Sequence, residues 1–176
     1  RTAGATPWSP RPASSPTAPT ARAIIAYRRA LERDLDTLLG MILSQALKLS
    51  SSDAGSLYLM ERDAAGKPST LRFKLSRNIT LPEIPFTEFS IPIDHTSIAG
   101  YVAATGDPLT IADVYLLPEQ VTYRLNRSFD EKFGYRTKSM LVLPMRTHRD
   151  EIIGVLQLIN RKRDADVRLA GPALVE

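Results

Sequence analysis

The two histidines are the first residues in this chain to consider for metal or haem chemistry. His95 precedes a helix-like run, residues 96–102, where it could cap the helix, contact a ligand phosphate or ligate a haem iron. His148 lies in a charged turn, residues 146–150, and we expect it to be solvated. The histidines are far apart in the sequence and the chain contains no cysteine, so no metal-ligand spacing is present. We therefore expect no metal site.

Charged clusters are the other candidates for catalysis or phosphate binding. Asp130 and Glu131 are adjacent, and neighbours on a helix point about 100° apart, so the two carboxylates cannot converge on one bond. We expect a solvated helix face, or Asp130 alone at the mouth of a pocket. The basic run 161–163 is interpreted as exposed linker. No glycine-rich phosphate loop occurs. We expect no catalytic residue, and hence no enzymatic activity, in this chain.

The charge of the chain argues against a nucleic-acid partner. The 176 residues carry a net charge of +4. Residues 1–40 hold six basic and three acidic residues, residues 161–176 hold four and three, and residues 41–160 hold thirteen of each. Nucleic-acid binders usually concentrate basic charge on a folded face, whereas here the excess lies in the flanks.

The absence of cysteine and of long apolar runs excludes further classes of protein. Without cysteine there is no disulfide scaffold, thiolate zinc site or cysteine nucleophile. The apolar runs are too short to span a membrane, and the start of the chain lacks the apolar stretch of a signal peptide. We expect a cytoplasmic location. Because the sequence begins at Arg1 and ends in a charged stretch, we interpret it as a piece of a longer protein.

Two different segments open the chain. Residues 1–21 are predicted to be a Pro-rich flexible linker, with Trp8 as the one large apolar residue of positions 1–20. Residues 22–49 are predicted to be an amphipathic helix, in which Leu39, Leu43 and Leu47 widen the apolar stripe. The stripe is close to a heptad seam, interrupted at Arg28 and Gln45 and formed by Ile24, Leu31, Leu35, Leu38, Ile42 and Leu49. For residues 35–49 we favour one broad stripe facing the core of the domain, and for residues 22–34 a helix-to-helix contact in a homodimer.

The rest of the chain alternates strands with loops. Residues 55–60 are predicted to form a strand, and Leu71, Phe73 and Leu75 alternate with polar residues as on a half-buried strand. A short extended piece near 89–93 leads to the helix at 96–102, capped by Asp94 or Thr96 and closed at Gly106. Residues 109–111 form a short strand, 113–137 a loop with some helix, and 139–145 with 151–160 a hairpin. Hairpin connections favour an antiparallel sheet with helices beside it, an α+β fold.

A series of motifs in residues 35–160 resembles the GAF domain, a small-molecule sensing module of cyclic-nucleotide phosphodiesterases, adenylyl cyclases and bacterial signalling proteins. The motifs occur in the order and at the spacing of that family, and the phosphodiesterase-like subgroup is the most similar. They are Asp53-Ala54-Gly55-Ser56-Leu57-Tyr58-Leu59, Ser97-Ile98-Ala99-Gly100-Tyr101-Val102 with Thr105-Gly106, Ile111-Ala112-Asp113-Val114-Tyr115, Phe129-Asp130-Glu131, Gly134-Tyr135-Arg136-Thr137-Lys138-Ser139-Met140 and Ile153-Gly154-Val155-Leu156-Gln157-Leu158-Ile159-Asn160.

The resemblance implies a six-stranded antiparallel sheet with the N-terminal helix on one face and short helices and loops roofing a pocket on the other. It implies a sensor domain over residues 22–160 and a charged linker, 161–176, toward an effector domain outside this sequence. The ligand-binding positions that it implies are Ser56 on the floor, Arg77 and Asn78 beside it, Ile98 and Ala99 at a helix start, Tyr115 on the wall, Asp130, Phe133 and Thr137 in the roof, and Gln157 on the last strand.

This sequence departs from the pattern of cyclic-nucleotide-binding members at three places. Arg161 follows Asn160 where a lysine is usual, and Lys162 comes one place later. Arg77 stands where many members have an acid beside the purine, and Phe133 replaces a small polar residue that often contacts the ligand. Free methionine sulfoxide reductases and bilin photoreceptors of this fold depend on cysteine, which this chain lacks.

The resemblance therefore implies a regulatory module without catalysis. Its partners would be a small-molecule ligand, with a cyclic nucleotide as one candidate, a second copy of the chain through the N-terminal helix, and a covalently linked effector domain. No other cofactor is expected. The alternative is a dimerisation scaffold whose vestigial pocket is closed by its own side chains, with Phe133 filling it.

Overall fold

The computed structural model describes residues 21–85, 87–163 and 169. Our expectations for residues 1–20, Trp8 included, and for most of 164–176 lie outside the described residues, as does the side chain of Ile24. The chain divides into two units, residues 1–34 and 35–176. Helix α1, Ala21–Ser50, contributes residues to both units. In the first unit, Tyr27 and Leu31 are exposed.

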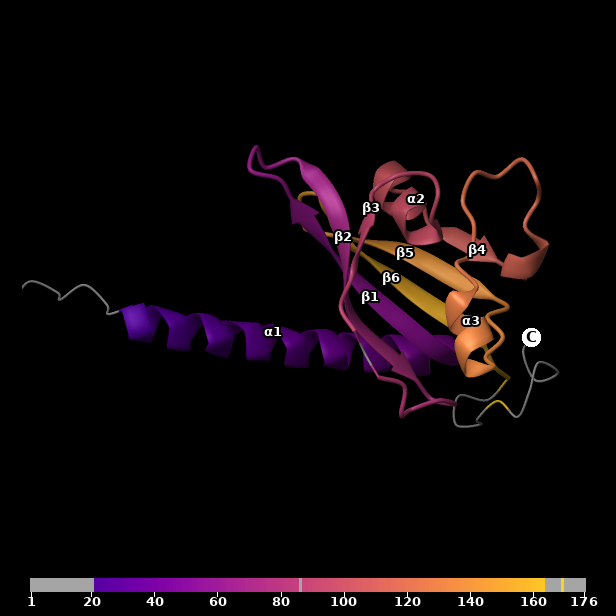
Figure 1. Cartoon of the computed structure of the whole chain (residues 1–176), viewed down its shortest axis with the longest axis horizontal. Helices are drawn as coiled ribbons and strands as arrows, with labels where there is room; N and C mark the ends of the chain where they lie inside the picture. The colour runs from indigo at the N-terminus through magenta and orange to yellow at the C-terminus, as the bar shows by residue number, and fades with distance from the viewer. Residues whose placement is uncertain (1–20, 86, 164–168, 170–176) are drawn as a thin grey trace, which may run out of the picture. The chain divides into compact units, whose positions relative to one another are not determined.

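The second unit is built on one six-stranded sheet (Figure 1). The strands lie in the order β3-β2-β1-β6-β5-β4, and every pair of neighbours is antiparallel. Their bounds are Ser52–Arg62 for β1, Pro68–Asn78 for β2, Ser90–Pro92 for β3, Leu109–Ile111 for β4, Met140–Arg146 for β5 and Ile152–Arg161 for β6. The predicted α+β fold with an antiparallel sheet is confirmed.

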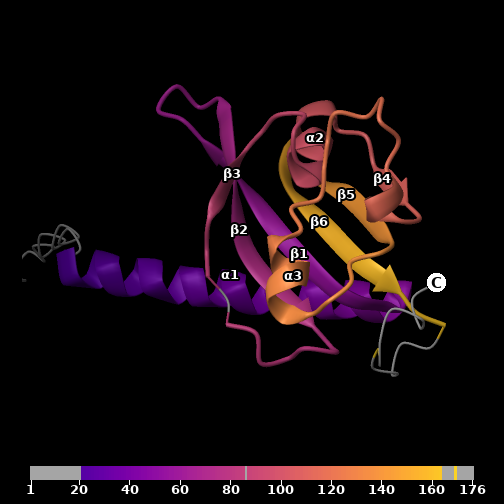
Figure 2. The same cartoon turned by 45° about the vertical axis from the view of Figure 1, so that its right-hand side comes forward.

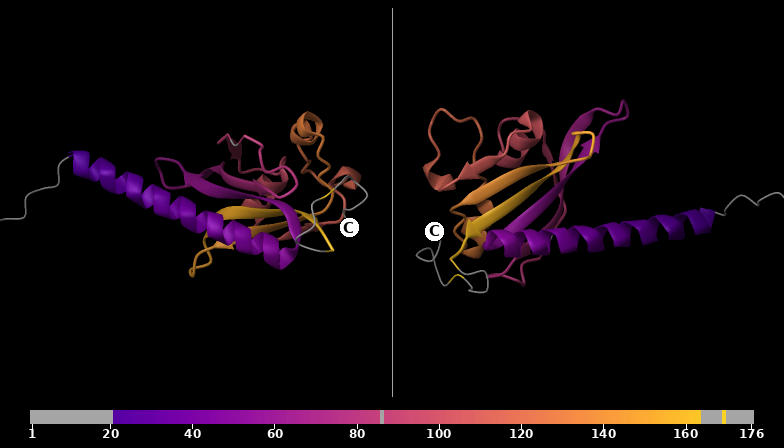
Figure 3. Two further views of the ribbon diagram at one scale, coloured as in Figure 1. Left: turned by 90° about the horizontal axis from the view of Figure 1, so that it is seen from below. Right: turned by 180° about the vertical axis from the view of Figure 1, so that it is seen from behind.

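The C-terminal part of α1 covers one face of this sheet (Figure 3). Leu43 and Leu47 are buried there against Leu156 and Leu158 of β6. The prediction of one broad core-facing stripe over residues 35–49 is wrong. Residues four apart on a helix share a face, so Leu39, Leu43 and Leu47 are buried together. The seam positions on another face stay exposed, namely Leu35, Leu38, Ile42 and Leu49.

A bulge in β2 changes which face its apolar residues reach. Leu57 of β1 pairs with Leu75, but the next residue, Tyr58, pairs with Phe73, so Lys74 is an extra residue in β2. Side chains alternate between faces along a strand, and one inserted residue reverses that alternation. Leu75 therefore packs in the cluster beneath α1 while Phe73 packs on the opposite face. The simple alternation that we predicted across Leu71, Phe73 and Leu75 is broken at this point.

The opposite face of the sheet carries α2, Ile98–Thr105, the 3-10 turn η1, Val114–Leu116, and α3, Ser128–Phe133 (Figure 2). Val102 of α2 is fully buried in the core of this face. The cap of α2 is Ser97, whose Oγ accepts a hydrogen bond from Gly100 N, and not Asp94 or Thr96 as predicted. Asp94 instead accepts both hydrogen bonds that Thr96 donates. The predicted end at Gly106 is confirmed, because this residue has a φ of 77°.

Candidate functional site

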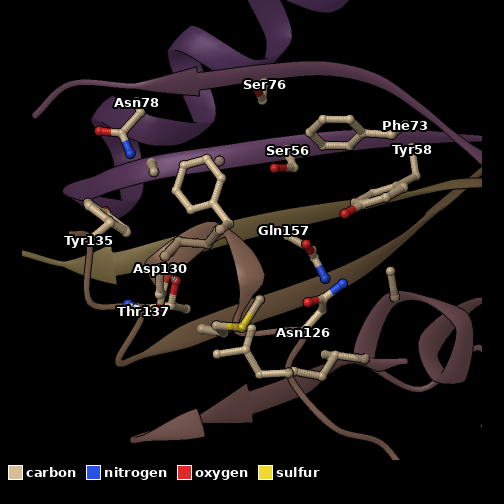
Figure 4. A pocket seen from close by; sticks show the side chains of 18 of the residues that line it. Ser56, Tyr58, Phe73, Ser76, Asn78, Asn126, Asp130, Tyr135, Thr137 and Gln157 are labelled. Atoms are coloured by element: carbon tan, nitrogen blue, oxygen red, sulfur yellow. Dashed lines mark hydrogen bonds between the residues drawn. The ribbon is translucent and has the colours of Figure 1, made fainter. Parts of the chain in front are cut away.

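A cavity of about 670 Å³ lies on the sheet face opposite α1 (Figure 4). Its walls come from β1, β2 and β6, from the start of α2 and from the segment 124–137 that includes α3. This volume falls in the range of small-molecule sites. Eight of the predicted site residues line it, namely Ser56, Arg77, Asn78, Ile98, Ala99, Asp130, Thr137 and Gln157.

The floor of the cavity is a polar row across three strands. Ser56 on β1 pairs with Ser76 on β2 and with Gln157 on β6. Directly opposed residues of antiparallel strands lie on the same face of the sheet, so this row faces the cavity. Ser56 is 8% exposed and Gln157 is 7% exposed. Within the described part of the chain, neither side chain has a hydrogen-bond partner, which leaves both hydrogen-bonding groups available to a ligand.

Aromatic rings close the cavity beyond this row. The ring centroids of Tyr58 and Phe73 are 5.1 Å apart, and those of Phe73 and Phe89 are 4.7 Å apart. Burial raises the pKa of Tyr58, so its phenol stays neutral. The sequence prediction missed Tyr58. The signal was present, because Tyr58 is two residues from Ser56 on a strand and residues at that spacing share a face.

The start of α2 forms a second wall. Ile98 and Ala99 are buried at 3% and 2% exposure and line the cavity. Ser97 serves two N–H groups of this helix end, because its Oγ accepts from Gly100 N and its carbonyl oxygen accepts from Tyr101 N. The Ala99 N–H belongs to the first turn, whose N–H groups suit an electronegative ligand atom.

Asp130 holds together the roof of the cavity, which is formed by residues 113–138. Its carboxylate accepts hydrogen bonds from the hydroxyl of Tyr115, the backbone N–H of Thr137 and the hydroxyl of Thr137, each 2.8 Å long. Asp130 is 5% exposed, so its carboxylate is already solvated by the protein's own donors. Asp130 and Thr137 line the cavity, and their main role there is to hold the roof in place through the hydrogen bonds between them.

Two predicted site residues lie outside the cavity lining. The Tyr115 ring stands between the guanidinium groups of Arg127, at 4.3 Å, and Arg136, at 3.9 Å. Burial and the hydrogen bond to Asp130 raise the pKa of Tyr115. Phe133 packs against Phe129, with the rings tilted by 49° and their centroids 5.0 Å apart, and does not line the cavity.

Arg77 and Asn78 contribute to the rim in different ways. Asn78 Oδ1 accepts a hydrogen bond from Leu81 N at 2.8 Å, which fixes the turn after β2. Arg77 pairs with Gly55 on β1, and a side chain at Gly55 would meet Leu43 and Leu47 of α1. Opposed residues share a face, so the Arg77 side chain leaves the sheet on the α1 side. We infer that its backbone, more than its guanidinium, borders the cavity.

A buried ionic network lies next to the cavity. The Asp53 carboxylate accepts hydrogen bonds from Tyr135 and Thr80, each 2.8 Å long, and its Oδ1 lies 3.4 Å from Lys162 Nζ. Lys162 is 3% exposed, so our interpretation of residues 161–163 as exposed linker is wrong at this residue. Asn160 extends the network, because its Oδ1 accepts from Lys138 N and its Nδ2 donates to the Arg136 carbonyl.

The histidines take no part in the cavity. His95 is exposed and packs against Tyr101, with the rings tilted by 59° and their centroids 5.3 Å apart. His148 is exposed in the turn between β5 and β6, as predicted. Over the described residues, no three His, Cys, Asp or Glu side chains come together as a metal site would require. None of the described helices has the length and apolar character needed to cross a membrane.

Comparison with known proteins agrees with this geometry. The sequence profile of the GAF domain family matches residues 34–171. Over 137 residues the chain is 32% identical to the dual 3',5'-cyclic-AMP and -GMP phosphodiesterase 11 of Drosophila melanogaster. That alignment spans 74% of this chain and 9% of the fly enzyme.

Two solved structures share the fold. The first is the GAF domain region of a membrane protein from Geobacter sulfurreducens, with a TM-score of 0.52 and 19% identity over 77% of this chain and 80% of that one. The second is a type II free methionine-R-sulfoxide reductase from Thermoplasma acidophilum, with a TM-score of 0.53 and 16% identity over 77% of this chain and 80% of that one. The match to the family profile covers most of the chain. The antiparallel sheet and the cavity on its face agree with the fold that the family resemblance implies. The chain belongs to the GAF domain family.

Proposed function

We propose that this GAF domain is a regulatory module that senses a small molecule in the cavity above its sheet. The observation that carries the proposal is the floor of that cavity. Ser56 and Gln157 are more than nine-tenths buried, face an open space of about 670 Å³ and have no partner among the described residues. Their polar atoms are not among the fully buried atoms without a partner in the described residues, so they are open to the cavity, and a ligand would supply their hydrogen-bond partners.

Binding without catalysis is the function that the charged groups support. The Asp130 carboxylate accepts three hydrogen bonds, and the Asp53 carboxylate accepts two and pairs with Lys162. A general base needs a free lone pair within reach of the substrate, and these carboxylates are already engaged. The chain has no cysteine to act as a nucleophile. We therefore assign the domain a binding role.

A cyclic nucleotide is the first ligand to test. The similarity to a dual cyclic-AMP and cyclic-GMP phosphodiesterase favours it, and stacking of a purine on an aromatic wall suits Phe73 and Tyr58. Calorimetric titration of the fragment with cyclic AMP, cyclic GMP and cyclic dinucleotides tests this. We expect heat from one of them and a loss of that heat in Gln157→Leu, with Leu116→Ala, an exposed change outside the lining, as the control. No heat and no thermal shift with any of them would remove the nucleotide ligand.

Signal transfer would run through the ends of the domain. The chain spans 9% of the fly enzyme that it matches, and we propose that an effector domain lies elsewhere in the parent protein. A ligand shifts a conformational equilibrium only by its difference in affinity for the two states. The roof 113–138 is the segment that ligand binding would order further, because its residues Asp130 and Thr137 line the cavity.

A dimerisation scaffold is the second candidate function. The exposed leucines on α1 favour it, with Leu31 at 50%, Leu35 at 43% and Leu38 at 53% exposure. Sedimentation of Leu31→Asp and Leu35→Asp variants tests this contact, and a dimer that persists in both would place it elsewhere. The vestigial-pocket version of this idea has less support, because the cavity is open and Phe133 lies outside its lining.

A further inference from the structure

Tyr58 presents to the cavity a hydroxyl that the fold does not use. The side chain rises from β1 two residues after Ser56, is 8% exposed and lines the cavity. Figure 4 shows the hydroxyl end of its ring pointing into the cavity toward Gln157. None of the described residues gives this hydroxyl a hydrogen-bond partner. The hydroxyl is not among the fully buried polar atoms without a partner in the described residues, so it is open to the cavity and available to a ligand.

The groups around that hydroxyl are polar and uncharged. Gln157 lies diagonally across from Tyr58, because Tyr58 pairs with Val155 and Ser56 pairs with Gln157. Diagonal neighbours on one face are about 7–8 Å apart, which leaves room for a ligand atom between the two polar ends. Asn126 also lines the cavity and, since its Oδ1 accepts a hydrogen bond from Ser128 N, offers its Nδ2. Together with Ser56 these side chains can both donate and accept.

Two charged groups of the lining, Asp130 and Arg124, are engaged within the protein, and the third, Arg77, leaves the sheet on the α1 side. Asp130 accepts three hydrogen bonds from the roof. The guanidinium of Arg124 donates to the carbonyl groups of Val121, Tyr123 and Glu119. An ionised ligand group placed against Tyr58 would find no countercharge there, and burying an unpaired charge is costly.

Resting on the function proposed above, we propose that Tyr58 is a specificity-determining residue that selects ligands with an uncharged planar group carrying an amide-like edge. The Phe73 ring provides the stacking surface. The Tyr58 hydroxyl donates to the carbonyl or ring-nitrogen acceptor of that edge, and Gln157 meets the adjacent donor. Amides and lactams fit this description, whereas amidinium and carboxylate groups of the same shape do not.

Three probes of nearly equal shape test the selection by charge. Benzamide is neutral, benzamidine is cationic and benzoate is anionic at pH 7, and each is titrated into the fragment while the nuclear magnetic resonance shifts of the cavity residues are recorded. We expect benzamide to bind at least about tenfold more tightly than either ion. We also expect Tyr58→Phe to weaken benzamide about fivefold, the effect of one hydrogen bond. Tyr123→Phe is the matched control, because Tyr123 is 9% exposed but lies outside the lining.

Thermal unfolding separates a binding role for Tyr58 from a structural one. Its hydroxyl has no partner in the described structure, so Tyr58→Phe should leave the midpoint unchanged or raise it while benzamide affinity falls. Equal binding of all three probes, or an unchanged affinity in Tyr58→Phe, would overturn the role of Tyr58 while leaving the sensor function standing. If no probe shifts any cavity residue and the nucleotide titrations are also without heat, both proposals fail.

Discussion

Replacing Lys162 by methionine tests the buried network most sharply. Lys162 Nζ lies 3.4 Å from Asp53 Oδ1, and the two side chains are 2% and 0% exposed. Methionine nearly preserves the length of the side chain and removes the positive charge. Removing one member of a buried ion pair typically destabilises a protein by about 3–5 kcal/mol, since the remaining charge is left uncompensated. Asp53 would keep its hydrogen bonds from Thr80 and Tyr135, so we expect the lower end of that range.

Thermal and urea unfolding followed by circular dichroism measure this effect. For a domain of this size, a loss of about 3 kcal/mol corresponds to a midpoint lower by roughly 10 °C. The double variant Asp53→Asn with Lys162→Met removes both charges but replaces one acceptor oxygen by an amide nitrogen, so we expect it to recover only about 1 kcal/mol relative to Lys162→Met alone. Arg161→Met is the control, because Arg161 is exposed and should change stability by less than about 0.5 kcal/mol.

A change of less than about 1 kcal/mol in Lys162→Met would refute this reasoning, because the pair would then contribute no more than a surface ion pair. Equal losses in the single and double variants would also contradict it, since the loss would come from packing and not from an unpaired carboxylate.

Three further changes follow from the same structure. Leu43→Ala should lower the free energy of unfolding by about 3 kcal/mol, because Leu43 is fully buried. Leu49→Ala, at an 88% exposed position, should change it little, and urea unfolding compares the two variants. Gly154→Ala should destabilise the domain strongly, because its Cβ would lie 2.2 Å from the Tyr58 carbonyl oxygen. Gly40→Ala has free space around the new Cβ and should stabilise α1 by about 0.5–1 kcal/mol. A fall in the melting midpoint of both variants would contradict this. Asp130→Asn should speed backbone hydrogen exchange across residues 113–138, since the amide nitrogen cannot accept the hydrogen bonds made at the carboxylate oxygen that it replaces. Unchanged exchange rates would show that the roof does not depend on these hydrogen bonds.

The sheet was predictable from the sequence because local patterns carry most of its information. Strands 109–111 and 139–145 and the helix end at Gly106 follow from apolar runs and a glycine, and the structure places β4, β5 and Gly106 accordingly. The bulge at Lys74 was not predictable, since nothing local marks an extra residue in a regularly alternating strand. The face reached by Leu75 depends on the register with β1, which is a long-range property.

The cavity was predictable in part. The positions carried over from the family resemblance place Ser56, Gln157, Ile98 and Ala99 in the lining. Tyr115 falls outside it, because its ring stands between two arginines that only the folded roof brings together.

Lys162 shows the limit of composition as a guide. A lysine in a run of charges is usually solvated, and here its burial depends on a carboxylate more than a hundred positions away in the sequence. Tyr58 shows a limit of a different kind. Its place on the strand could be inferred, but the lack of a partner for its hydroxyl depends on every residue packed around it.

The most direct test of the sensing role is the mass of the folded domain after contact with small molecules. The fragment is dialysed against a low-molecular-weight cell extract and measured by native mass spectrometry beside a variant carrying Ser56→Leu and Gln157→Leu. We predict an added mass of one small molecule that is lost on unfolding and is absent from the variant. The bare mass alone, or the same added mass on the variant, would contradict a ligand-sensing cavity.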